Sequence, residues 1–470
     1  MIKKFFLNVS IYGVLPVFGK VLNFLLVFLY AKFFTPAEFG IIDLFETAAF
    51  FLLAITSFEI PTALGRFFYE ETTTSHKKTI VSTGFYLTLL TTSITCLILI
   101  FCRDVILRNY SGDVDYYSLY WLALIWLFSM TVNTYLSFIP RYDNNPRRYV
   151  MVGMINNLIK LLLSLLFVVI MKLGIKGIFY GLISGSTISL LLYAIIYKKY
   201  IGLNFSFVYS QKILRYVLPL LPGVIIAGLW MPFLRFYMAS SFPFIVLGYY
   251  AFASRLTSVN TILHGALVTA WTPFLFERKD ELLDGENIKR ISGLIFLLSI
   301  MLSISLTVFS PEATLLIGTN DYLEAVKLIA FVSFAGTIKI MTQIRGFGPY
   351  IKDKTQYISA AHIISLITCA AFLFLLRGHH SFYIIGVVVV LYELIIYLIQ
   401  SSYTIKTCHV NPYYSWELIL LIALIVSGLV IQAHLALLYR MVVFLVSFAI
   451  FLHIIRTTYH TTIAKVLKWR

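Results

Sequence analysis

The sequence predicts an all-α integral membrane protein with about fourteen transmembrane helices. Of its 470 residues, 60% are hydrophobic and only 12% are charged, with a mean hydropathy of +0.89. Soluble globular proteins carry about 25% charged residues. Apolar runs of about 20 residues recur along the whole chain, and this length crosses the hydrocarbon core of a bilayer. Strands of a transmembrane barrel would instead appear as short alternating segments.

Short connections join the predicted spans and leave no room for a soluble domain. The approximate ranges are 9–31, 39–60, 80–102, 117–139, 149–171, 177–197, 214–236, 245–272, 290–310, 323–344, 356–376, 381–402, 415–433 and 437–456. The first run is too long for the apolar part of a signal peptide, and no small-residue cleavage pattern follows it. No P-loop pattern and no metal-binding cysteine spacing occurs, so we expect neither cofactor nor metal.

The distribution of basic residues predicts that both termini are cytoplasmic. With the N-terminus inside, 24 of the 37 Lys and Arg residues lie on the inner side, 9 on the outer side and 4 deep within spans, namely Lys20, Lys160, Arg255 and Lys339. This bias is the positive-inside pattern of membrane proteins. The net charge of +16 therefore reports topology, and we expect no nucleic-acid partner.

Two segments of the chain resemble each other and suggest a duplicated architecture. The first begins "YGVLPVFGK" at Tyr12 and the second begins "RYVLPLLPG" at Arg215. Each predicts a pair of helices that enters from and returns to the cytoplasm, although two unrelated helical hairpins would also look alike. Parallel repeats with a substrate site between the halves are a known transporter plan. The predicted division is residues 1–200, residues 201–405 and two additional helices in residues 406–470.

Four stretches of the chain carry a resemblance to a known family: "SFEIPTALGRFFYEE", "LPLLPGVIIAGLWMPFLRFYM", "LGYYAFASRLTSVNTILHGALVTAWTPFLFE" and "FSPEATLLIGTNDYLEAVKLIAFVSFAG". They resemble the Wzx-type flippases of polysaccharide biosynthesis, within the MOP exporter superfamily. The resemblance implies two six-helix lobes in a MATE-like arrangement around a cationic cavity. It implies movement of undecaprenyl-diphosphate-linked oligosaccharide from the inner to the outer leaflet of the bacterial inner membrane, by alternating access. A polysaccharide polymerase and a chain-length regulator are the protein partners it implies.

The count of fourteen spans departs from the twelve common in that family. It is similar to that of the lipid II flippases, whose two extra helices form a groove for a lipid tail. The superfamily also contains multidrug antiporters, so the substrate class stays open.

Cations within or near the spans are the candidate substrate-binding residues, because ionisable groups at membrane depth usually face a cavity or a partner. They are Lys20, Arg66, Lys160, Arg235, Arg255, Lys339 and Arg345. Few deep acids oppose them, namely Glu46, Glu59 and Glu393. Arginine grips phosphate oxygens in a bidentate fork and lysine acts as a point charge. We therefore expect this surplus of cations to bind a diphosphate.

Each of these residues also has a structural interpretation. Lys20 can pair with Glu46, Arg235 and Arg345 can extend to the membrane interface, and positive-inside topology explains Arg66. The residues Glu46, Glu59, His264 and Glu393 are candidates for ion coupling, with interhelical hydrogen bonds as the alternative. Asn156, Asn157, Asn260 and Gln343 are candidates for binding sugar hydroxyls or for joining helices.

Two other functions compete with a polysaccharide flippase. A multidrug antiporter that exports organic cations should hold more deep acids than bases, which this sequence does not show. A membrane polymerase or ligase should present a sizeable outer loop with reactive groups, and the predicted outer loops are short. We therefore expect a transporter rather than an enzyme.

Overall fold

The fold is described from a computed structural model, in which all regular elements of the described residues are helices. These residues are 18, 19, 22, 24–71, 73–108, 114–143, 145–258, 260, 286–352, 354, 356–377, 381, 383–408, 416–432 and 437–459. The chain forms two compact units, Met1–Leu247 and Gly248–Arg470. The predicted division at residues 200 and 405 stays a prediction.

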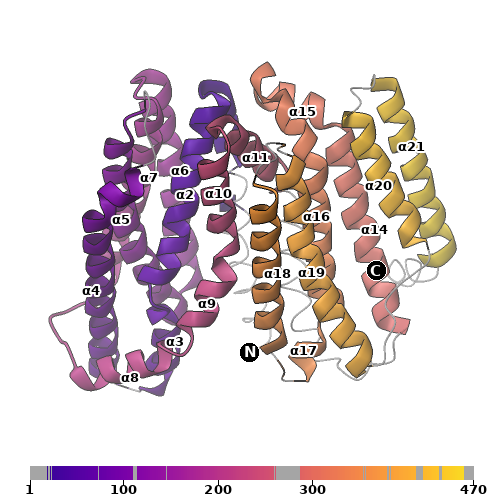
Figure 1. The fold of residues 1–470 in the computed structure, drawn as a ribbon. Coiled ribbons are helices and arrows are strands. Elements are labelled where there is room, and N and C mark those ends of the chain that lie inside the picture. Colours follow the sequence, from indigo (N-terminus) through magenta and orange to yellow (C-terminus); the bar gives the residue numbers. More distant parts are fainter. Residues whose placement is uncertain are drawn as a thin grey trace. The chain divides into compact units, whose positions relative to one another are not determined.

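The first unit contains a long bent element made of α2 (Pro36–Thr56) and α3 (Ile60–Glu70) (Figure 1). Thr35 and Glu38 form a capping box that starts α2, which satisfies backbone donors left free at a helix start. Phe58 and Glu59 both have φ of 52°. This left-handed backbone cannot continue a helix, so the chain bends before α3 begins.

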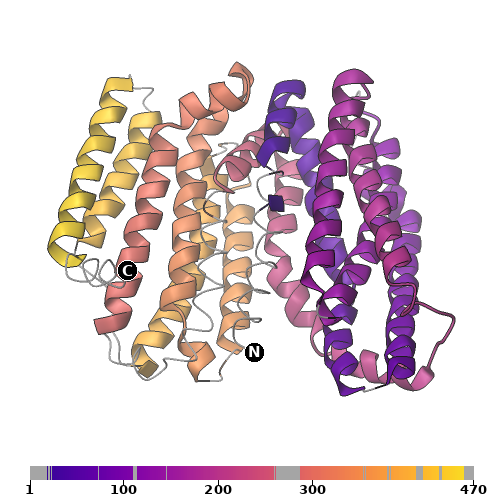
Figure 2. The ribbon, with the colours of Figure 1, turned by 180° about the vertical axis from the view of Figure 1, so that it is seen from behind.

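Four further helical segments complete the body of the first unit. They are α4 (Thr74–Leu107), α5 (Tyr116–Tyr142), α6 (Pro146–Leu165) with the π-helical turn η1 (Leu166–Ile170), and α7 (Ile175–Ile196). Helices α5, α6 and α7 pack against one another (Figures 1 and 2). Asp115 accepts a hydrogen bond from the Ser118 amide at 3.0 Å and so caps α5.

The predicted span at residues 214–236 is not one helix but part of three. They are α8 (Phe207–Val217), α9 (Leu221–Gly228) and α10 (Trp230–Ser241). Proline cannot donate to the preceding turn, and Pro222 accordingly lies in the first turn of α9. Helix α8 packs on α3 and α4, and α9 and α10 pack on α2. The whole segment therefore belongs by its packing to the first unit.

The second unit is built around α14 (Glu286–Val308), α16 (Val326–Arg345) and α19 (Tyr383–Cys408). Shorter elements α15 (Ser310–Ile317), η2 (Asn320–Ala325) and α17 (Gly348–Ile351) connect them, α18 (Gln356–Leu375) packs on α19, and α11 (Phe244–Leu256) spans the boundary between the units. A buried apolar cluster that includes Ile300, Ile304 and Ile344 fills the interior between α14 and α16.

The last two helices, α20 (Glu417–Gln432) and α21 (Leu437–Ile454), are integral to the second unit. Helix α20 packs on α14 and α16, and α21 packs on α14 and α20 (Figures 1 and 2). Two bidentate ion pairs join this hairpin to the unit: Arg345 with Glu417, and Arg440 with Glu312, each with a shortest N–O distance of 2.6 Å. The hairpin is therefore held by specific polar contacts as well as by apolar packing.

Within the described residues, ten helices are long and apolar enough to cross a membrane, and three shorter apolar helices accompany them. The all-helical membrane architecture is thus confirmed, and the count of fourteen spans is not. The second half of the predicted span at residues 245–272 (259 and 261–272) lies outside the described residues. So do the start of the first repeat segment and the end of the second.

Candidate substrate-binding site

Three neighbouring helices of the first unit each carry polar side chains at helical spacing. On α5, Asn133, Ser137 and Arg141 are four residues apart. Residues three or four apart lie on the same helix face. Helix α6 repeats the pattern with Tyr149, Gly153 and Asn157, and α7 with Ser189 and Tyr193. Because these helices pack together, the polar faces meet inside the unit.

The polar faces enclose a cavity of about 140 Å³, here called the polar pocket. Its lining consists of Asn133, Thr134, Ser137, Tyr149, Gly153, Asn156, Asn157, Ser189 and Tyr193. The Ser189 hydroxyl donates to the Asn133 side-chain oxygen at 2.8 Å, and the Tyr193 hydroxyl donates to the Tyr149 carbonyl at 3.2 Å. Amide and hydroxyl groups both donate and accept hydrogen bonds, which suits a polyhydroxylated ligand.

Two cations lie close to residues that line the polar pocket. The Arg141 guanidinium donates to the Tyr149 hydroxyl and lies 4.3 Å from the centre of that ring and 4.4 Å from the centre of the Phe138 ring. Its Nε is buried and has no hydrogen-bond partner among the described residues. Lys160 follows Asn156 and Asn157 by one turn of α6 and is half-buried. The pocket therefore combines sugar-binding chemistry with positive charge.

Close packing of α6 and α7 fixes one wall of the pocket. Gly177, Gly181 and Gly185 recur every four residues on α7, the spacing that lets membrane helices approach closely. A Cβ atom added at Gly181 would lie 2.1 Å from the Ser164 hydroxyl oxygen, and one at Gly185 would lie 3.0 Å from the Asn156 side-chain oxygen. The glycines therefore bring the amides of α6 up to α7.

Three of the predicted substrate-binding cations pair with carboxylates of the chain itself. The Nε of Arg235 on α10 lies 2.6 Å from an Asp43 oxygen on α2, and both side chains are buried. Arg345 is 2% exposed and binds Glu417. Arg66 is exposed, lies 3.4 Å from Glu70 and stacks on the Tyr216 ring at 5.0 Å. The surplus of buried positive charge expected from the sequence is therefore smaller in the structure.

Of the remaining predicted cations, the three that the structure describes lie on three different helices. Lys160 borders the polar pocket, whereas Arg255 is half-buried in the last turn of α11. Lys339 is exposed on α16, where it acts electrostatically on the half-buried Glu393 of α19. Lys20 and His264 lie outside the described residues. The substrate-binding role of all seven cations stays a prediction.

The predicted coupling acids of the first unit have local partners. Glu46 accepts a hydrogen bond from the Tyr30 hydroxyl at 2.9 Å. Glu59 precedes α3 in a left-handed conformation and accepts from the Thr62 hydroxyl at 2.5 Å. These contacts fit the structural alternative given for both residues, and ion coupling stays a prediction.

Sequence reasoning missed Arg141 and the acids Asp43 and Glu417. The four-residue spacing of Asn133, Ser137 and Arg141 was a readable signal. This polar spacing is easily overlooked, because the other residues of the segment are mostly apolar. No local signal identifies Asp43 as the partner of Arg235, because 192 residues separate the two.

The comparisons with known proteins agree with this architecture. Residues 29–327, which include the polar pocket, match the family model described as polysaccharide biosynthesis protein.

The chain belongs to the polysaccharide biosynthesis protein family. Among curated protein sequences, none matches the chain.

Two solved structures show the fold of this family member, each with a TM-score of 0.65. One is an inward-facing multidrug resistance MATE family transporter of the MOP superfamily, at 13% identity over 85% of this chain and 98% of that chain. The other is the lipid II flippase MurJ in an inward closed conformation, at 16% identity over 96% of this chain and 99% of that chain. At these identities the likeness shows the fold.

Proposed function

We propose that the protein is a flippase that moves undecaprenyl-diphosphate-linked oligosaccharide from the inner to the outer leaflet. The observation that carries the proposal is the polar pocket between α5, α6 and α7, where amides and hydroxyls lie between Arg141 and Lys160. Membership in the polysaccharide biosynthesis protein family supports a sugar-containing cargo. The fold shared with a transporter and a flippase supports translocation.

The chemistry of the pocket matches the head group of such a cargo. Sugar hydroxyls exchange hydrogen bonds with Asn156 and Asn157, and their ring faces stack on tyrosine rings such as Tyr149. The diphosphate needs a cation, which Lys160 provides beside the pocket. Arg141 holds the Tyr149 hydroxyl of the pocket lining.

We infer that transport proceeds by alternating access and that the membrane potential contributes to its direction. Moving one charge through the field is worth about 2.3 kcal/mol per 100 mV. A diphosphate that moves outward from a negative interior gains roughly twice that amount. Clamping the potential to zero in vesicles without ion gradients should reduce the outward bias, and an undiminished bias would refute this electrical contribution.

The substrate assignment is tested by flipping in proteoliposomes. We expect the purified protein to expose an undecaprenyl-diphosphate-linked oligosaccharide to an external glycosidase. The double substitution Asn156→Ala and Asn157→Ala should lower the initial rate at least about tenfold, since two amide contacts of about 1 kcal/mol each are lost. Asn204 is exposed in a loop, so Asn204→Ala is the matched control. Equal rates for the two proteins would contradict the assignment.

A multidrug antiporter is the second candidate, because a multidrug resistance transporter shares the fold as closely as the lipid II flippase does. The pairing of Arg235 and Arg345 with carboxylates also weakens the argument from cation surplus. Export of an organic cation such as ethidium, without flipping of lipid-linked sugar, would favour it. Flipping of lipid II in the same assay would favour the lipid II type of cargo.

We further propose the biological setting of this activity. The cargo is the repeat unit of O-antigen lipopolysaccharide or of another surface polysaccharide, and the site is the bacterial inner membrane with both termini cytoplasmic. A polysaccharide polymerase and a chain-length regulator are the proposed protein partners. Loss of the protein should therefore leave lipid-linked oligosaccharide on the inner leaflet.

A further inference from the structure

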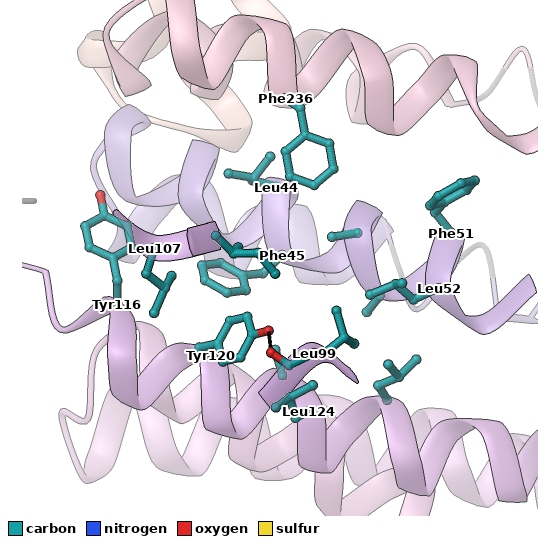
Figure 3. A pocket seen from close by; sticks show the side chains of 15 residues that line it. Leu44, Phe45, Phe51, Leu52, Leu99, Leu107, Tyr116, Tyr120, Leu124 and Phe236 are labelled. Atoms are coloured by element: carbon teal, nitrogen blue, oxygen red, sulfur yellow. Dashed lines mark hydrogen bonds between the residues drawn. The ribbon is translucent and has the colours of Figure 1, made fainter. Parts of the chain in front are cut away.

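A second cavity of the first unit, here called the apolar pocket, lies between α2, α4, α5 and α10. Its volume is about 270 Å³. Leu44 and Phe45 of α2 lie between Phe236 of α10 on one side and Tyr120 and Leu124 of α5 on the other (Figure 3). The pocket lies among membrane-spanning helices, so its natural ligands are molecules that reach it from the bilayer.

The lining of the apolar pocket suits a hydrocarbon chain. Aliphatic and aromatic side chains dominate it, and the Tyr120 hydroxyl already donates to the Leu99 carbonyl at 2.7 Å (Figure 3). A polar ligand would lose its hydration there without gaining partners. A 150 Å³ apolar cavity accommodates benzene, so this pocket has room for roughly ten carbon atoms, or about two isoprene units.

The position of the apolar pocket two turns along α5 from the polar pocket points to its occupant. Leu127 of α5 lines the apolar pocket, and Thr134 of the same helix lines the polar pocket. Seven residues are two helical turns, so both positions lie on one face about 10 Å apart along the axis. A ligand with a polar head and a branched hydrocarbon tail matches this sequence of surfaces. A bulk phospholipid, whose head group stays at the membrane surface, does not.

A buried ion pair holds one wall of the apolar pocket in place. Arg235 and Phe236 are adjacent on α10, and Asp43 and Leu44 are adjacent on α2. The 2.6 Å contact between Arg235 and Asp43 therefore fixes α10 against α2 beside the pocket. The ion pair therefore restrains the two helices that carry Leu44 and Phe236.

We propose that the apolar pocket binds the isoprene units of the cargo's tail that lie nearest the diphosphate, while the oligosaccharide occupies the polar pocket. The inference rests on the proposed function, because it assigns the tail of the same lipid-linked cargo. It places the tail on α2, α5 and α10 of the first unit and not on α20 and α21.

Photocrosslinking of the wild-type protein in proteoliposomes tests this placement. The probe is an undecaprenyl-diphosphate-linked oligosaccharide with a diazirine in its second isoprene unit, and a phosphatidylglycerol with a diazirine in its acyl chain is the comparison. We expect the probe to label peptides of α2, α5 and α10 much more strongly than the phospholipid does. Labelling confined to α20 and α21, or equal labelling of the pocket by both lipids, would overturn the inference.

A pocket-filling substitution gives an independent measurement. Ala123 lines the apolar pocket, and Ala123→Phe should raise the KM for the undecaprenyl cargo about tenfold, the factor that corresponds to ~1.4 kcal/mol. Binding of the tail-less oligosaccharyl diphosphate methyl ester should not change. Ala371 is exposed on α18 in the second unit, so Ala371→Phe is the matched control.

The outcomes separate the inference from the proposed function. If the wild-type protein flips no lipid-linked oligosaccharide, the proposed function fails. If it flips the cargo but Ala123→Phe behaves as Ala371→Phe does, only the assignment of the apolar pocket fails.

Discussion

Arg345 and Glu417 illustrate how single charged residues are accommodated inside this membrane protein. Their side chains form two hydrogen bonds, of 2.9 and 2.6 Å, and both residues are buried. Removing charges from water is costly, and the mutual attraction offsets that cost only when the geometry is good. The pair therefore depends on both partners, and each side chain is destabilising without the other.

Breaking this pair should destabilise the second unit. Glu417→Ala leaves the Arg345 guanidinium buried without its carboxylate, so we expect the free energy of unfolding to fall by about 3–5 kcal/mol. The double variant Arg345→Met with Glu417→Leu should recover most of the loss, because no charge is then buried. Unfolding in mixed micelles measures both values. A double variant no more stable than Glu417→Ala would contradict the pairing argument.

The Arg440–Glu312 pair provides a comparison at the same scale. The Glu312 side chain is 43% exposed, so water shares the stabilisation of its charge. Glu312→Ala should therefore cost less stability than Glu417→Ala in the same unfolding experiment. A larger loss at Glu312 would show that exposure does not govern these two pairs.

At the scale of elements, the contact between α6 and α7 depends on the absence of side chains. Gly181→Ala places a methyl group against Ser164, and we expect a loss of stability of about 1–3 kcal/mol from overpacking. Gly223 on α9 has nothing within 4 Å of an added Cβ. Gly223→Ala should therefore stabilise, by roughly 0.5–1 kcal/mol. Thermal unfolding should show a lower melting temperature for Gly181→Ala and a higher one for Gly223→Ala than for the wild type.

The Asp115 carboxylate, which caps α5, should make the stability of the fold depend on pH. Hydrogen bonds from Lys176, at 2.8 Å, and from Ser118 hold the pKa of Asp115 well below its usual range. A carboxyl group with a lowered folded pKa stabilises the fold above its unfolded pKa of about 3.9, and this contribution is lost as pH falls toward the folded pKa.

Asp115→Asn should remove that contribution while retaining a good helix cap. The difference in melting temperature between wild type and variant should be largest near neutral pH and should shrink below about pH 4. Melting curves at several pH values measure it. A difference that grows on acidification would show that the sign is wrong.

At the scale of the whole molecule, the sequence predicts membrane topology through the distribution of basic residues. Leu203 is 92% exposed in a predicted inner loop, and Leu316 of α15 is 72% exposed on the predicted outer side. In a variant without native cysteines, Leu316→Cys should react with an impermeant maleimide in intact cells. Leu203→Cys should react only after the membrane is opened. The reverse pattern would invert the predicted orientation.

Hydropathy predicted the long helices well, because burial in lipid or protein requires apolar residues along the whole span. The predicted ranges 80–102 and 117–139 lie within α4 and α5. The break between α8 and α9 could be predicted in part from the sequence. Pro219 lies just before α9, and Pro222 lies in its first turn.

The candidate site was less accessible from the sequence than the helices were. Asn156, Asn157 and Lys160 were identified because polar groups are conspicuous in an apolar run. Arg141 lies just beyond the predicted span 117–139, and only the packing of α5 on α6 shows that it contacts Tyr149 of the pocket lining. Partners distant in sequence, such as Asp43 for Arg235, need the tertiary structure.

The packing of α8, α9 and α10 on the first unit has a consequence for reconstituting the protein from two separately expressed polypeptides. A cut at residues 201–206 would deprive α3 and α4 of the cover that α8 gives them, and would separate Arg235 from Asp43. A cut at Phe242 or Pro243, in the short connection after α10, keeps these contacts within one fragment. Complementation in a deletion strain should therefore succeed with the second pair of fragments and fail with the first.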